Sequence, residues 1–127
     1  MTSGYSGTPL PKKLGIGPDS RVQFVRAPES FVAEVGLDTN AADDLDVVVV
    51  FCLTLKDLEE AFALKTAIKK AGAIWIAWPK KASKIPTEIT EDTLRDVGLP
   101  LGLVDNKVCA IDEKWSGLRF VWRKELR

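Results

Sequence analysis

The stretch that decides the fold is Val47-Val-Val-Val-Phe-Cys-Leu53, a continuous run of apolar and mostly β-branched residues. Such runs are typical of a central parallel strand covered on both faces. Thr54 follows as a helix N-cap, and Asp57 takes the third helical position, where a carboxylate favours the exposed backbone N–H groups. Periodic apolar residues then predict a helix that runs to about Ala71 and is stopped by Gly72.

Strand and helix signals also precede this unit. Residues 21–26 alternate in part between apolar and polar and predict a first strand. Residues 29–36 follow Pro28 and end at a glycine, which favours a short helix; a short strand over 31–35 is the alternative. The region between 37 and 46 is polar and acidic and is expected to be a loop.

The alternation continues toward the C-terminus. Residues 73–78 are apolar on both faces and predict a second central strand. Thr90 caps the next helix, which Gly98 and Pro100 end. Two strands over 103–111 and 118–124 then form an antiparallel hairpin, with residues 112–117 as its loop.

This order of elements predicts an α/β fold: a three-layer Rossmann-like domain with a mostly parallel five-stranded sheet and a C-terminal antiparallel hairpin. Residues 21–127 form this single domain. Residues 1–20, rich in glycine, serine and proline, are expected to be an extended N-terminal arm. Leu10, Leu14 and Ile16 are the side chains that anchor the arm to the domain.

Composition excludes several chemistries. The 127 residues carry 18 basic and 18 acidic side chains and no histidine, so His-based triads, dyads and metal sites are absent. A net charge of zero argues against general nucleic-acid binding. The charges are segregated, however, and residues 61–84 contain six lysines and no acid. This block either neutralises acidic neighbours or forms a local cationic site.

Cys52 and Cys109 lie far apart in apolar runs, which indicates two buried thiols in a reducing compartment. The N-terminal residues do not resemble a signal peptide, and the longest apolar run is too short to span a membrane. The sequence therefore predicts a cytoplasmic protein without a metal site.

Three stretches resemble the bacterial domain of unknown function 3052 family, namely residues 5–16, 75–83 and 102–118. This resemblance implies a small bacterial cytoplasmic protein and carries no known activity. More distantly, residues 14–22 and the terminal hairpin resemble the Rossmann-like methyltransferase fold. That resemblance implies the strand order 1-2-3-5-4, whereas the half-polar last strand by itself favours an edge position.

A cofactor is not expected. Dinucleotide sites and related sites need a glycine-rich turn after the first strand, where the backbone approaches the ligand. The corresponding turn, residues 26–30, has no glycine, and it contains Pro28 and Glu29. Methyl transfer is therefore the least favoured activity.

One candidate site remains, because the loops that follow parallel strands meet at the carboxyl edge of a sheet. The residues expected there are Trp78, Lys80, Lys81, Ser83, Lys84, Trp115 and Ser116. Alternatively, the lysines form a solvated loop, Trp78 belongs to the rim of the core, and Trp115 is covered by the arm through Tyr5, Pro9 and Pro11.

The function we expect is a non-enzymatic binding or interaction module that uses this edge to hold a protein partner. The alternative is an enzyme or sensor for a small anionic ligand, such as a nucleotide or phosphorylated metabolite. Nucleic-acid and membrane partners are not expected. The first strand, at a sheet edge, offers a surface for homodimer formation.

Overall fold

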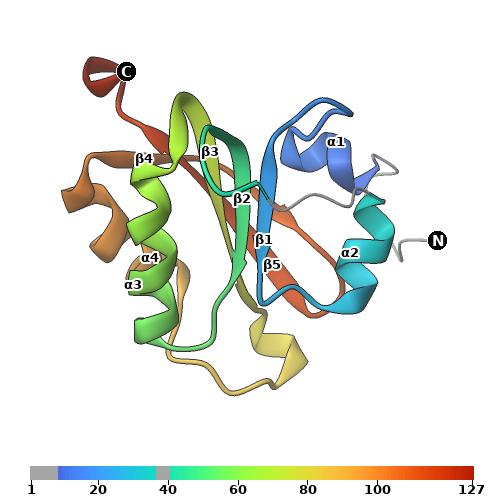
Figure 1. The fold of residues 1–127 in the computed structure, drawn as a ribbon. Helices are drawn as coiled ribbons and strands as arrows, with labels where there is room; N and C mark the ends of the chain where they lie inside the picture. Colours follow the sequence, from blue (N-terminus) through green and yellow to red (C-terminus); the bar gives the residue numbers. More distant parts are fainter. Residues whose placement is uncertain (1–8, 37–40) are drawn as a thin grey trace.

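The computed structural model describes residues 9–36 and 41–127, and its five strands form one mixed sheet (Figure 1). The parallel strands are β1 (Val22–Val25), β2 (Leu45–Phe51) and β3 (Ile68–Pro79). The antiparallel strands are β4 (Leu103–Ala110) and β5 (Trp115–Trp122). The order β1-β2-β3-β5-β4 confirms the predicted fold class and, of the two positions considered for the last strand, the one that the methyltransferase-like resemblance implies.

The last strand lies inside the sheet, between β3 and β4, so an edge position is wrong. The polar residues of β5 suggested an edge position, but they also fit an inner strand. Arg119, for example, pairs with Trp75 on β3 and is only half-buried. A long side chain can cover apolar surface with its stem while its charged end reaches water. Polar residues in a strand therefore do not require an edge.

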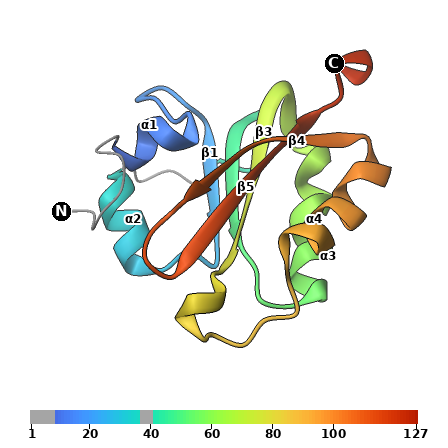
Figure 2. The same ribbon diagram turned by 180° about the vertical axis from the view of Figure 1, so that it is seen from behind.

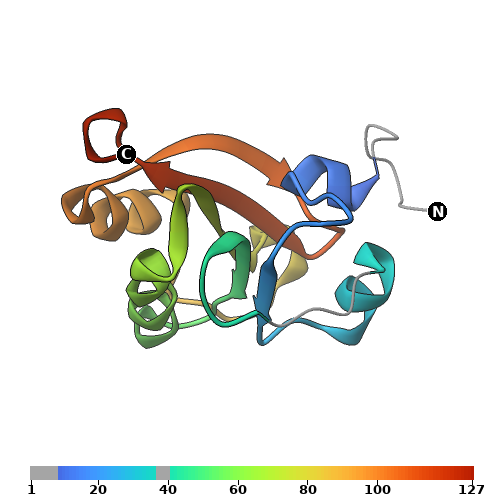
Figure 3. The same cartoon turned by 45° about the horizontal axis from the view of Figure 1, so that its top comes forward.

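Helices cover both faces of the sheet (Figure 3). One face carries α1 (Leu10–Leu14) and α2 (Glu29–Val35), and the other carries α3 (Leu55–Ala63) and α4 (Glu91–Gly98). Each face has its own apolar cluster, so β2 and β3 are buried on both sides, as their sequences predict. The short 3₁₀ turns are η1 (Leu64–Thr66), η2 (Lys81–Ser83), η3 (Leu99–Leu101) and η4 (Lys124–Leu126).

The predicted extended arm contains a helix, α1, and this part of the prediction is wrong. Pro11 lies in the first turn, where backbone N–H groups make no intrahelical hydrogen bond, so the helix loses no bond through the missing N–H of proline. Gly15 ends the helix with φ +76°. Leu10 and Leu14 are buried, and the Trp75 indole Nε1 donates to the Leu14 carbonyl oxygen at 3.0 Å. Residues 10–16 are thus part of the domain core.

The predicted helix after β2 begins correctly and ends too late. Thr54 and Asp57 form a capping box, in which the Asp57 N–H donates to Thr54 Oγ1 at 3.1 Å and the Thr54 N–H donates to the carboxylate at 3.2 Å. The helix stops at Ala63, and Ile68 already pairs with Leu45 on β2.

Gly72, expected to stop that helix, lies buried inside β3. A Cβ there would meet the Leu45 carbonyl oxygen at 2.6 Å, so the close approach of β2 explains the glycine. Within the described part of the chain, no helix has both the length and the apolar character that crossing a membrane requires.

Candidate functional site

A groove of about 560 Å³ opens where β3 ends, on the face that carries α3 and α4. Figure 2 shows the η2 turn below the end of β3, beside the turn of the β4–β5 hairpin. The groove is lined by Trp78, Pro79, Lys80, Lys81, Lys84, Ile85, Pro86, Thr87, Ile89, Thr90 and Glu91. The structure thus places four of the predicted site residues, Trp78 and the three lysines, around one hollow.

Backbone hydrogen bonds fix the lysine wall of the groove. The Lys80 N–H donates to the Lys114 carbonyl oxygen at 2.8 Å, which ties the chain after β3 to the hairpin turn. Ser83 Oγ donates to the Lys80 carbonyl oxygen at 2.6 Å and accepts from the Ile85 N–H at 3.2 Å. Ser83, predicted as a binding residue, therefore shapes the loop. Lys84 follows in left-handed backbone at φ +60°.

The opposite wall is tied to the loop between β2 and α3. Thr87 Oγ1 donates to the Leu53 carbonyl oxygen at 2.7 Å, and the Glu88 N–H donates to the same oxygen at 2.9 Å. The Leu55 N–H donates to Glu88 Oε1 at 2.8 Å. Leu53 and Leu55 are 38% and 46% exposed, so apolar surface extends past this rim of the groove.

The groove is electrostatically positive. Glu91 is the carboxylate among its lining residues, and it accepts a hydrogen bond from Arg95 Nη2 at 2.6 Å. Glu91 and Asp105, which both bind this guanidinium, raise the pKa of Arg95, so the acid is engaged. Across the described ranges 9–36 and 41–127, neither Lys81 nor Lys84 is held in an ion pair. Their ammonium groups remain available to an anionic partner.

The two tryptophans expected at this site lie on opposite faces of the sheet. Trp78 belongs to the α3–α4 cluster and is only 8% exposed, so it forms the buried floor of the groove. Trp115 is the first residue of β5 rather than part of a loop, and it packs on the α1–α2 side. Its ring contacts Phe51 edge-to-face at 5.0 Å between centroids. Tyr5, part of the arm expected to cover Trp115, lies outside the described residues.

Ser116 pairs with Trp78 on β3 and is half-buried at the start of β5. Paired residues of adjacent antiparallel strands share a face of the sheet, so Ser116 lies on the groove side but outside the groove lining. Of the predicted residues, the structure therefore brings together Trp78, Lys80, Lys81 and Lys84, with Ser83 as a support.

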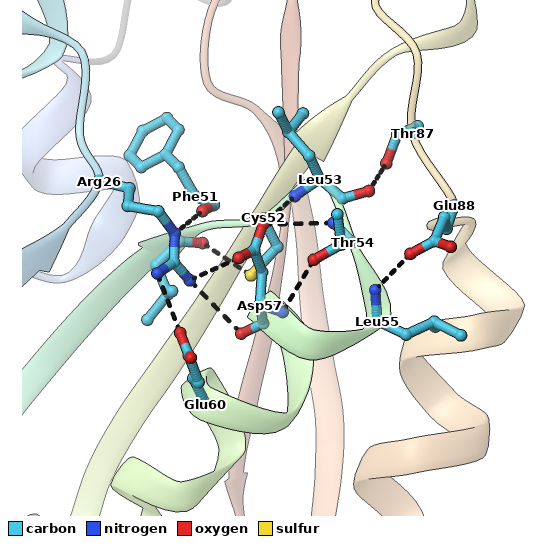
Figure 4. A network of polar contacts seen from close by, with 11 residues as sticks. Arg26, Phe51, Cys52, Leu53, Thr54, Leu55, Asp57, Glu60, Thr87 and Glu88 are labelled. Carbon is cyan, nitrogen blue, oxygen red and sulfur yellow. Dashed lines mark hydrogen bonds and ion pairs between the residues drawn. The ribbon is translucent and has the colours of Figure 1, made fainter.

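A single side chain bridges the carboxyl ends of β1 and β2. Figure 4 shows Arg26 reaching across from the end of β1 to Phe51 on β2 and to the first turns of α3. Its Nε donates to the Phe51 carbonyl oxygen at 3.1 Å, and its guanidinium pairs with Asp57 at 3.5 Å and with Glu60 at 3.1 Å. Arg26 has φ +56°, a strained conformation for a side-chain-bearing residue.

Two titratable groups beside Arg26 are fixed by their surroundings. Hydrogen bonds from the Leu53 and Thr54 N–H groups, with Arg26 nearby, hold the pKa of the Asp57 carboxyl below its ordinary value. Burial raises the pKa of the Cys52 thiol to about 12. Cys52 is therefore protonated at neutral pH and has no thiolate character for nucleophilic chemistry. Burial also raises the pKa of Cys109.

Solved structures of several proteins, a methylase among them, share this fold. The fibrillarin pre-rRNA processing protein of Methanococcus jannaschii superposes with a TM-score of 0.55 at 12% identity, over 91% of this chain and 69% of its own. The ribosomal protein L11 methylase of Lactobacillus delbrueckii subsp. bulgaricus gives 0.50 at 13%, over 84% and 60%. LepI, solved in complex with SAM, gives 0.51 at 13%, over 90% and 39%.

Identities this low show the fold alone. The chain spans less than two thirds of the L11 methylase and LepI chains. No family model matches the chain, and no curated protein does.

The residues at the end of β1 do not fit S-adenosylmethionine, the cofactor that this fold family implies. In a Rossmann-like fold the ligand lies beyond the carboxyl ends of the strands, at a reversal of strand order, against a glycine turn and a helix N-terminus. Here β1, β2 and β3 follow one another without a reversal, and the Arg26 side chain bridges the ends of β1 and β2. Pro28 is the N-cap of α2, and Glu29 is the first residue of that helix. No methyl-transfer step follows from this geometry.

Sequence reasoning missed the second wall of the groove and Arg26. Ile89 and Thr90 carry the signals of a helix start, which gave no hint that they also line a groove. The sequence did contain a signal for the role of Arg26: it is a basic residue at the end of β1, and acids follow in the first turns of the helix after β2.

Proposed function

We propose that the chain is a non-enzymatic binding module that holds an acidic segment of a partner protein in the groove at the end of β3. The observation that carries this proposal is that lysines without an ion pair among the described residues lie next to apolar surface. Lys81 and Lys84 border a hollow whose floor is Trp78, and exposed Leu53 and Leu55 continue beyond its rim. A peptide with acidic and apolar side chains complements both surfaces.

A binding role also agrees with the side chains that are missing from this edge. The chain has no histidine, and the Ser83 hydroxyl is engaged with the backbone of its own loop. A nucleophile needs an adjacent base, and the hydrogen bonds of the Ser83 hydroxyl join it to backbone groups and not to a basic side chain. Recognition is the chemistry that these groups support.

A small anionic ligand is the second candidate. The groove volume of about 560 Å³ falls within the range of small-molecule sites, roughly 300–1,000 Å³, and three lysines border it. A nucleotide or a phosphorylated metabolite would meet the same cations. We place this second because Trp78, with 8% of its surface exposed, offers little ring area for stacking.

The test compares matched lysine variants. A fluorescein-labelled peptide of alternating glutamate and leucine is titrated against the wild type, Lys81→Gln/Lys84→Gln, and Lys65→Gln/Lys124→Gln, and anisotropy gives Kd. We expect about tenfold weaker binding for the first variant only, because two charge contacts are lost. Equal affinity in all three proteins would refute the groove as the site. Binding of ATP but not of the peptide, lost in the groove variant, would favour the second candidate.

The family and location remain part of the proposal. The resemblance of residues 5–16, 75–83 and 102–118 to the domain of unknown function 3052 family supports a small bacterial cytoplasmic protein. Cys52 and Cys109 are free thiols, which fits a reducing compartment. A homodimer through β1 also stays a prediction. The Ala41 N–H already binds the Val22 carbonyl oxygen at 3.1 Å, so part of that strand is covered.

A further inference from the structure

A second hollow lies on the other face of the sheet, where α1 packs against the β4–β5 hairpin. It measures about 160 Å³ and is lined by Lys12, Lys13, Leu14, Gly15, Lys107 and Arg119. Four of these six residues are cationic, and the lining contains no carboxylate. Three separate elements supply the cations, so the tertiary fold, and not a local run of lysines, brings them together.

Hydrogen bonds between α1 and β4 fix the position of two of the cations. Lys107 Nζ donates to the Lys13 carbonyl oxygen at 3.1 Å, and Lys13 Nζ donates to the Ala110 carbonyl oxygen at 3.4 Å. These bonds hold the end of α1 against β4. An ammonium group has three donors, so the bond from Lys107 to a neutral carbonyl leaves its charge uncompensated.

Three of the cations, Lys12, Lys107 and Arg119, are not paired with an acid in the described part of the chain. By contrast, Arg26 and Arg95 each contact carboxylates. Asp46 borders the neighbouring hollow together with Arg119. Its carboxylate already accepts from Lys69 Nζ at 3.0 Å and from the Arg21 N–H at 2.8 Å.

We propose that this hollow is a binding site for a phosphate group, carried as phosphate, diphosphate or a small phosphate ester. Arg119 Nη1 donates to Asn106 Oδ1 at 3.5 Å, and the other N–H groups of the guanidinium are donors suited to phosphate oxygens. The lysines supply point charges around them. The volume of about 160 Å³ corresponds to roughly five water molecules. That size fits one or two phosphate groups and is too small to enclose a nucleoside.

Trp75 provides a reporter that lies behind the site. Its side chain is fully buried, and its indole N–H donates to the carbonyl oxygen of Leu14, a residue of the lining. A ligand that draws in the side chains around Leu14 changes this hydrogen bond. The Trp75 indole resonance in a ¹H–¹⁵N spectrum, assigned with Trp75→Phe, therefore reports on binding directly.

The experiment titrates sodium pyrophosphate into the full chain at constant ionic strength. We expect a saturable shift of the Trp75 indole resonance and about tenfold weaker binding in Lys107→Gln/Arg119→Gln. Lys81→Gln/Lys84→Gln, altered at the other groove, should bind like the wild type. If the double variant fails to fold, exposed Lys12→Gln should weaken binding by a smaller factor.

The site would be overturned by no saturable shift, by the same shift with sodium chloride, or by equal affinity in the Lys107→Gln/Arg119→Gln protein. A shift that disappears only in Lys81→Gln/Lys84→Gln would also overturn it, because the anion would then bind at the end of β3. Peptide binding at that groove is measured separately, so either proposal can fail alone.

Discussion

The carboxyl edge of the sheet has two different parts: at β1 and β2 the Arg26 side chain bridges the strand ends (the closed part), and at β3 a groove opens (the open part). At the closed part, the Arg26 guanidinium binds the Phe51 carbonyl and the acids of α3. At the open part, lysines border a groove, and Lys81 and Lys84 have no acidic partner among the described residues. Both parts carry cations. Arg26 is paired with acids of its own chain, whereas Lys81 and Lys84 form no ion pair with the described residues and offer a binding surface.

This difference shows that, within one fold, the groove at the carboxyl edge can lie beside different strands. In Rossmann-like domains the ligand lies beyond the first strands. In the described part of this chain the first two strands are β1 and β2, and the Arg26 side chain bridges their carboxyl ends. The groove instead forms beside β3, where the chain from Lys80 to Thr90 crosses to α4.

The largest expected effect is a loss of packing beneath the closed part. Phe51 contacts Phe31 at 4.9 Å and Trp115 at 5.0 Å between ring centroids, and it is buried. Phe51→Ala should lower the free energy of unfolding by about 3–5 kcal/mol in urea titrations. Half-buried Ile85, on the groove wall, is the matched control, and Ile85→Ala should cost less than about 1.5 kcal/mol. Equal costs would mean that the two parts are equally packed.

Arg26 itself should separate side-chain contacts from backbone strain. Arg26→Ala should lower stability by about 1–2 kcal/mol, mainly through the lost bond to the Phe51 carbonyl, since the exposed ion pair with Glu60 contributes little. Arg26→Gly should be more stable than Arg26→Ala by roughly 0.5–1 kcal/mol, because glycine adopts the positive φ without strain. An alanine variant more stable than the glycine variant would contradict that conformation.

Asp57 makes the closed part sensitive to acid. Its folded-state pKa lies below the ordinary value, so its contribution to stability is present at neutral pH and is lost as the pH falls through that pKa. Asp57→Asn should cost about 1 kcal/mol at pH 7, by urea titration, and less in acid. A difference from the wild type that stays constant down to acidic pH would show that the carboxylate charge is not what stabilises the cap.

The smallest effect on stability is expected at the groove. Lys81→Gln/Lys84→Gln should change the free energy of unfolding by less than about 0.5 kcal/mol, because the two side chains are exposed and make no ion pair with the described residues. Thermal unfolding measures this without a ligand. A loss above 1 kcal/mol would mean that these lysines support the fold and were not left free for a partner.

Local signals in the sequence predicted most of the fold. Thr54 and Thr90 mark helix starts because a cap depends on residues only three positions apart. The end of α3 was missed because Leu64 and Ile68 continue a helical spacing, while pairing of Ile68 with Leu45 depends on a strand 23 positions earlier. Long-range pairing overrides local periodicity, and a single sequence does not display it.

Only part of the site could be predicted, because some of it follows from local signals and the rest depends on long-range strand pairing. The loop after a parallel strand must lie at the carboxyl edge, so the groove lysines could be found from the order of elements. The faces of Trp78 and Trp115 depend on register. Because Pro79 pairs with Trp115, Trp78 and Trp115 point to opposite sides of the sheet. A shift of one residue would have put both on one face, and nothing local to either tryptophan sets that choice.

The most direct test of the account maps binding on the backbone. A ¹⁵N-labelled chain is titrated with the alternating glutamate–leucine peptide and, separately, with S-adenosylmethionine. The account predicts that the peptide shifts amides between Lys80 and Thr90 and leaves Arg26, Ala27 and Glu29 unmoved, and that S-adenosylmethionine shifts neither group. Saturable shifts of Arg26, Ala27 and Glu29 with S-adenosylmethionine would contradict it, because the edge at β1 would then be open.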